Sequence, residues 1–100
     1  MFQHDVYFWL KDGLTDAERD AFRASLQTLR NIAVIERVVI GTPVPSERAV
    51  VDSSFSFSLH VTFQDAEAHD QYQVDPLHTA FVADNNAKWT RVQVYDSEVE

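Results

Sequence analysis

Two side chains that could carry out acid–base chemistry stand six positions apart in the second half of the chain, Tyr72 and His78. An imidazole titrates near neutral pH, so His78 could remove a proton next to a carbonyl group. A tyrosine hydroxyl could donate a hydrogen bond to the resulting enolate oxygen, or hold the imidazole in place. Because Pro76 separates the two residues, helical spacing alone does not show that they converge. The alternative interpretation is structural: His78 caps or buttresses a helix, and Tyr72 packs at its edge.

The other three histidines fall in different settings. His4 lies on the apolar face of a predicted strand and needs a hydrogen-bond partner there. It is either a core histidine bonded to the second helix or a polar group at the base of a ligand pocket. In the second case His4 and His78 could point into the same space between helices and sheet. His60 falls on the opposite sheet face, and His69 on a helix face that we expect to be exposed.

Metal, nucleotide and nucleophile chemistry find little support in the sequence. The histidines lack an H-x-x-x-H spacing, and only Asp75 and His78, three positions apart, could touch one ion, so we predict no metal. With two glycines, the chain has no phosphate-binding or dinucleotide motif, and we predict no cofactor. There is no cysteine and no evident activated serine for nucleophilic catalysis.

Composition narrows the class of protein. The chain has 100 residues, 45% of them hydrophobic, which is the size of one domain with one core, and we treat residues 1–100 as a single domain. A net charge of −8 with scattered basic residues argues against nucleic acid and anionic membranes as partners. No apolar run approaches the ~20 residues that span a bilayer. Because there is neither a secretory signal nor a cysteine, we expect a cytoplasmic location.

Hydrophobic periodicity predicts four strands and two helical regions. Apolar residues alternate in the strands, most clearly over 54–63, and a Thr15–Glu18 capping box opens the first helix. Pro76 breaks or kinks the second helical region and suits a first helical position. The predicted strands are 2–10, 33–40, 54–63 and 89–95, and the predicted helices run from 15 to about 30 and from 65 to about 84.

The order β-α-β-β-α-β is typical of a ferredoxin-like α+β fold, with a four-stranded antiparallel sheet and two helices on one face. The Phe-rich sheet face should lie under the helices. The other face would then expose an unusual number of aromatic and branched residues, which predicts a homodimer formed through it; a monomer with a solvated face is the alternative. The large residues expected there are Tyr7, Trp9, Val39, Trp89 and Tyr95. The facing of the second strand stays open, because Glu36 interrupts either pattern.

Several of these residues occur together in a pattern that resembles the stress-responsive A/B barrel (Dabb) domains, a family of the dimeric α/β barrel superfamily. The pattern consists of the strand His4-Asp5-Val6-Tyr7-Phe8, Gly41, the segment Tyr72-x-x-Asp75-Pro76-x-His78-x-x-Phe81, and Asp96. The resemblance implies a ferredoxin-like protomer and a homodimer whose two sheets form the barrel. One departure is Asp75, where members of the family often have histidine.

The resemblance also implies a candidate site. Most members have no established activity, but a plant branch contains polyketide cyclases, whose catalytic tyrosine and histidine correspond to Tyr72 and His78. Their pocket lies between helices and sheet. By position, it would be lined here by His4, Val6, Phe8, Phe22, Leu26, Leu59, Phe81 and Val92.

Two classes of function follow. The chain is either a homodimer of the stress-responsive type that binds a small hydrophobic ligand, or a cofactor-independent enzyme acting on a hydrophobic carbonyl compound by cyclase- or lyase-like chemistry. A small barrel monooxygenase is a further alternative. A cavity of a few hundred Å³ that contains His4, Tyr72 and His78 would favour the enzyme. A space filled by phenylalanine rings would exclude it.

Overall fold

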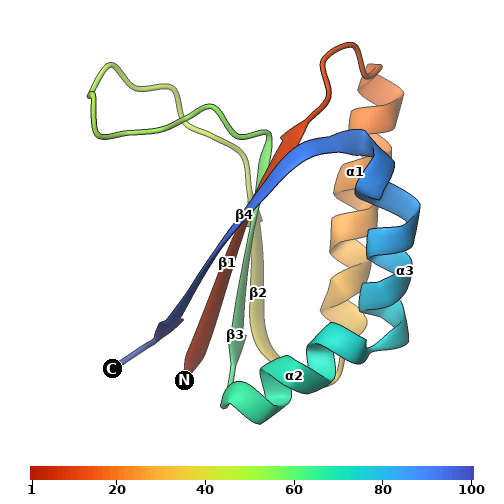
Figure 1. Cartoon of the computed structure of the whole chain (residues 1–100), viewed down its shortest axis with the longest axis vertical. Coiled ribbons are helices and arrows are strands. Elements are labelled where there is room, and N and C mark those ends of the chain that lie inside the picture. The colour runs from red at the N-terminus through yellow and green to blue at the C-terminus, as the bar shows by residue number, and fades with distance from the viewer.

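A computed structural model describes residues 1–100 and confirms the ferredoxin-like α+β fold. The sheet is antiparallel, with strand order β2-β3-β1-β4, and the helices cover one of its faces (Figure 1). None of the helices is long and apolar enough to cross a membrane. The elements in chain order are β1 (Phe2–Leu10), α1 (Asp16–Thr28), the 3₁₀ turn η1 (Leu29–Asn31), β2 (Ile35–Gly41), β3 (Phe57–Phe63), α2 (Ala66–Val74), α3 (Pro76–Asn85), the 3₁₀ turn η2 (Asn86–Lys88) and β4 (Trp89–Glu98).

The two central strands, β1 and β3, carry the core because both are flanked by neighbours and alternate strictly. Val6 stands opposite Leu59 on β3 and opposite Val94 on β4. Phe8, Phe22, Phe57 and Phe81 pack there with aliphatic residues in one cluster of 13 buried side chains. Gly41 fits beside β3 because a Cβ atom at this position would lie 2.8 Å from the Ser58 hydroxyl.

The helix starts are set by side-chain caps. The predicted capping box is present: Thr15 Oγ1 accepts from the Glu18 amide at 3.1 Å, and Glu18 accepts from the Thr15 amide. Pro76 divides the second helical region into α2 and α3. Asp75, the residue that departs from the family pattern, caps α3 by accepting from the Leu77 amide at 2.9 Å.

One large side chain lies on the other face from the one we predicted. Trp89 packs inward, with its ring centroid 5.5 Å from that of Phe8, and not on the outer sheet face. The cause is a bulge, since Trp9 pairs with Arg91 but Leu10 pairs with Trp89. The extra residue, Thr90, reverses the alternation at the start of β4.

Two further strand predictions change for the same kind of reason. β3 begins at Phe57 and not at Ser54, because the Ser56 amide and hydroxyl bond the β1 backbone at Phe8 and Leu10. The alternation over 54–63 predicts Phe55 on the Phe-rich inner face with Phe57, but Phe55 lies on the outer face, with its ring centroid 5.0 Å from that of Tyr7. In β2 the register shifts between Ile35 and Arg37. This irregularity at Glu36 explains why a period of two left the facing of β2 open.

Candidate functional site

A cavity of about 360 Å³ lies between the sheet and helices α2 and α3. Its walls are mostly apolar, and three of its polar groups are the residues that the sequence marked for chemistry. The exposed fractions of Val92 (37%) and Val94 (40%) show that it opens to solvent along the edge strand β4. The lining residues are His4, Val6, Phe8, Leu59, Tyr72, Gln73, His78, Phe81, Val82, Trp89, Val92 and Val94.

Tyr72 and His78 do converge. Their ring centroids are 4.6 Å apart, because Pro76 bends the chain so that the first turn of α3 faces the last turn of α2. The Tyr72 side chain is buried, and its hydroxyl makes no hydrogen bond within the chain. Burial raises the pKa of Tyr72 well above its ordinary value, so the hydroxyl stays protonated and can donate.

His78 is held in one tautomer. Its Nδ1 lies 3.2 Å from the Gln73 carbonyl oxygen, which can only accept, so Nδ1 carries the proton. Nε2 makes no hydrogen bond within the chain, and its lone pair is available to a molecule in the cavity. Burial lowers the pKa of His78, and the bond to Gln73 only partly opposes this effect. His78 is therefore a neutral base at pH 7.

His4 belongs to the same cavity but bonds a strand instead of the second helix. Its Nδ1 donates to Asp96 Oδ1 at 2.6 Å, directly across the β1–β4 register. Burial lowers the pKa of His4 despite the opposing effect of Asp96, so this contact is a hydrogen bond donated by a neutral ring. The His4 ring centroid is 6.0 Å from that of Tyr72.

The residues predicted to line the cavity divide into two groups. His4, Val6, Phe8, Leu59, Phe81 and Val92 line it. Phe22 and Leu26 do not, because both are fully buried in the packed core under α1. Trp89 was missed because of the bulge, whereas Val94 could have been found, since it stands two positions from Val92 on the same face.

His69 is not on an exposed helix face as we expected. It stands three positions before Tyr72 on the sheet-facing side of α2, and its side chain is only 14% exposed. Its ring stacks on Phe2 with centroids 4.4 Å apart and lies 4.9 Å from the ring of His4. The spacing to Tyr72 was the signal that could have placed it.

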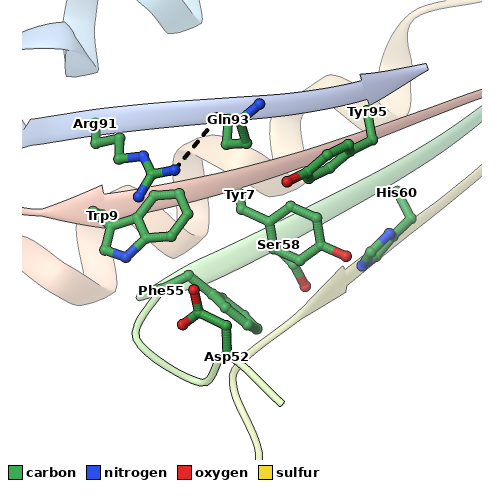
Figure 2. Close-up of a pocket in the computed structure, with 9 residues that line it drawn as sticks. All are labelled: Tyr7, Trp9, Asp52, Phe55, Ser58, His60, Arg91, Gln93 and Tyr95. Carbon is green, nitrogen blue, oxygen red and sulfur yellow. Dashed lines mark hydrogen bonds between the residues drawn. The ribbon is translucent and has the colours of Figure 1, made fainter. Parts of the chain in front are cut away.

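A second hollow, of about 350 Å³, lies on the outer sheet face, where Figure 2 shows side chains from β1, β3 and β4 gathered over the strands. The Arg91 guanidinium lies 4.3 Å from the centre of the Trp9 ring. His60, which lines the hollow, has its Nδ1 2.7 Å from Asp5 Oδ1. The lining residues are Tyr7, Trp9, Asp52, Phe55, Ser58, His60, Arg91, Gln93 and Tyr95. This surface is separate from the cavity of His4, Tyr72 and His78.

The fold and the cavity define a class: small ferredoxin-like α+β proteins in which a helix-covered sheet face encloses a pocket. Within that class the chain belongs to the stress responsive A/B barrel domain (Dabb) family, whose pattern matches residues 2–99. The predicted family is thus confirmed. No curated protein matches the chain.

Solved structures with the same fold come from plants and bacteria. An Arabidopsis thaliana protein superposes with a TM-score of 0.84 at 20% identity, covering 100% of this chain and 96% of its own. A hydroxynitrile lyase from Passiflora edulis gives 0.84 at 19% identity, covering 99% and 93%. A Dabb protein from Mesorhizobium loti gives 0.81 at 21%, covering 99% and 96%. Similar proteins of unknown function from Bacteroides fragilis and Thermobifida fusca are dimeric.

Proposed function

We propose that this chain is a cofactor-independent enzyme that binds a small, largely apolar carbonyl compound in the helix–sheet cavity and abstracts a proton next to the carbonyl group. The observation that carries the proposal is the pairing of Tyr72 and His78, with ring centroids 4.6 Å apart, in a mostly apolar cavity of about 360 Å³. Pockets of this size bind small molecules, and their few polar groups fix the orientation of the ligand.

The proposed step needs only these two side chains. His78 Nε2 takes the proton from the carbon next to the carbonyl, and the electron pair of that C–H bond moves to form the enolate. The Tyr72 hydroxyl donates a hydrogen bond to the enolate oxygen, where the negative charge develops. In an aldol cyclisation, the enolate carbon then attacks a second carbonyl of the same molecule, and the alkoxide that forms takes the proton back from His78 Nε2. In an isomerisation, His78 instead returns the proton to a carbon of the enolate.

The test is a panel of small substrates with the wild type and two variants. β-Keto compounds test cyclisation and decarboxylation, a hydroxynitrile tests the activity named for the Passiflora neighbour, and oxygen uptake tests the monooxygenase alternative. His78→Ala should lower the rate of the active member by about 10²- to 10⁴-fold. Thr79→Ala, an exposed neighbour on the same helix, should retain it.

Two outcomes would contradict the enzyme. Equal rates for the wild type and His78→Ala would remove His78 from the mechanism. If the wild type binds carbonyl compounds saturably but turns over no member of the panel, the enzyme is excluded and the chain is a ligand-binding protein, the other function that the sequence allows.

We also propose that two copies pair through the outer sheet face. The exposed side chains there include Tyr95, which is 59% exposed, and Val39, which is 39% exposed. The segment 42–56 projects on the side of the sheet away from the helices (Figure 1), where a second copy would contact it. Fold neighbours of this chain are dimeric. Light scattering at micromolar concentration should report twice the chain mass of 11.5 kDa, and a monomer there would overturn this proposal.

A further inference from the structure

Three side chains of the kinds that bind transition metals meet near one end of the cavity. His4 on β1, His69 on α2 and Asp96 on β4 each offer one ligand atom, and these atoms lie within 4.8 Å of one another. Sequence spacing offered no sign of this group, because each ligand comes from a different element. Of the three, only His4 also lines the cavity.

The donor set selects a class of ion. Imidazole nitrogen with carboxylate oxygen suits Zn²⁺ and similar first-row divalent ions, whereas Mg²⁺ and Ca²⁺ prefer oxygen ligands alone. Donor atoms around a tetrahedral ion with bonds of about 2.0–2.2 Å stand about 3.3–3.6 Å apart. The three atoms lie within 4.8 Å of one another, so each separation must change by at most about 1.5 Å for them to share an ion.

The surroundings allow this rearrangement. His4 is buried, and its Nδ1 lies 2.6 Å from Asp96 Oδ1, so these two atoms must separate by about 1 Å if both bind the ion. Asp96 is the ligand with room to move, because its side chain is 41% exposed, whereas that of His69 is only 14% exposed.

The Phe2 ring stacks on His69 and shields one side of the group. His69 has a polar neighbour at each ring nitrogen: Asp70 Oδ1 lies 3.4 Å from Nδ1, and Gln73 Nε2 lies 3.0 Å from Nε2. If Nε2 binds the ion, the Gln73 amide must release it, and Asp70 then supports the ligand from behind, as carboxylates commonly do.

We propose that His4, His69 and Asp96 bind one Zn²⁺-like divalent transition-metal ion per chain, with the remaining coordination positions open to water. The ion would tie α2 to both β1 and β4 beside the cavity. The net charge of −8 favours cation uptake. This inference goes beyond the proposed function, because the proton abstraction by His78 uses no ion and the metal alone tests the site.

The experiment uses the full chain without a polyhistidine tag. Co²⁺ is titrated while visible absorption is recorded, and Zn²⁺ binding is measured by calorimetry. We expect one ion per chain, a Co²⁺ spectrum of low coordination number, and displacement of Co²⁺ by Zn²⁺. His69→Gln and Asp96→Asn should each weaken binding about tenfold or more. In side-chain ¹H–¹⁵N spectra, the resonances of His4 and His69 should shift at one equivalent of Zn²⁺.

His60 provides the matched control, because it also lies beside a carboxylate, with 2.7 Å between His60 Nδ1 and Asp5 Oδ1, but belongs to no such group of three. His60→Gln should keep the wild-type affinity. Binding that His69→Gln leaves unchanged, or no saturable binding at one equivalent, would overturn the site. Loss of binding in His78→Gln with retention in His69→Gln would overturn it as well, since it would assign the ion to Asp75 and His78.

Discussion

Burial shifts the pKa values of His78 and Tyr72, the proposed acid–base pair, in opposite directions. It lowers the pKa of His78, which keeps the imidazole neutral and able to accept a proton. It raises the pKa of Tyr72, which keeps the hydroxyl protonated and able to donate. The apolar walls of the cavity thus place both groups in the form that the proposed step requires.

Tyr72→Phe separates catalysis from packing. It removes only a hydroxyl that makes no hydrogen bond within the chain, so we expect a melting temperature equal to or above that of the wild type. If that hydroxyl stabilises the enolate, kcat should fall by about 10²- to 10³-fold. Thermal melting and steady-state kinetics on the active panel member measure the two effects. A variant with unchanged kcat would restrict Tyr72 to a packing role.

The lowered pKa of His78 also predicts how stability depends on pH. The unfolded histidine gains a proton near its ordinary pKa of 6.5, whereas the folded one gains it at a lower pH. The contribution of His78 to stability is therefore complete above that value and is lost as the pH falls through the folded pKa. Urea unfolding followed by tryptophan fluorescence should show less loss of stability between pH 7 and about pH 5 in His78→Gln than in the wild type. Parallel losses in both proteins would contradict the burial of His78.

At the scale of elements, helix caps position the site. Asp75 caps α3 and thereby fixes the first turn, in which His78 is the third residue. Thr15 performs the same task for α1, whose buried residues do not line the cavity. Removing either cap should therefore lower stability by a similar amount, but only the loss of the Asp75 cap should affect the candidate site.

Removal of either cap should cost about 1 kcal/mol of stability. We expect Asp75→Ala to lower kcat as well, because the His78 ring loses its fixed position, whereas Thr15→Ala should leave kcat unchanged. Denaturant unfolding and kinetics on both variants make the comparison. An equal loss of activity in both variants would mean that stability alone controls the rate.

The helices and strands could be predicted from the sequence wherever neighbouring residues in the chain determine their bounds. The capping box, the break at Pro76 and the alternation in β1 each specify backbone geometry without a partner. Trp89 and Phe55 lie on the opposite sheet face from the one predicted. The bulge in β4 changes the facing of Trp89, and the hydrogen bonds between Ser56 and the β1 backbone change that of Phe55. Both features depend on the neighbouring strand. The contact of His69 with Phe2 and His4 arises in the same way, between elements far apart in sequence.

The two faces of the sheet differ in what they contact. The inner face, under the helices, holds the core and the cavity of His4, Tyr72 and His78. The outer face holds the hollow around Trp9 and Arg91 (Figure 2) and is the surface that we propose for a second copy. Each protomer of the proposed dimer would therefore keep its own cavity.

A charge on the outer face should disrupt pairing. Tyr95→Glu places an unpaired carboxylate on this surface, so we expect the dissociation constant of the dimer to rise at least about tenfold. Val74→Glu is the matched control, because Val74 lies on α2 and is 75% exposed, and this variant should remain dimeric. Sedimentation velocity over a concentration series measures both. Equal assembly of the two variants would exclude the outer face as the interface.

Proton abstraction by His78 can be measured as exchange of the hydrogens next to the carbonyl of a small aryl ketone in D₂O, followed by ¹H NMR. Exchange reports the proposed abstraction by His78 without requiring a known substrate or product. We expect the wild type to accelerate exchange above the rate in buffer and His78→Ala to exchange at the buffer rate. Equal exchange in the wild type and His78→Ala would contradict the proposed abstraction.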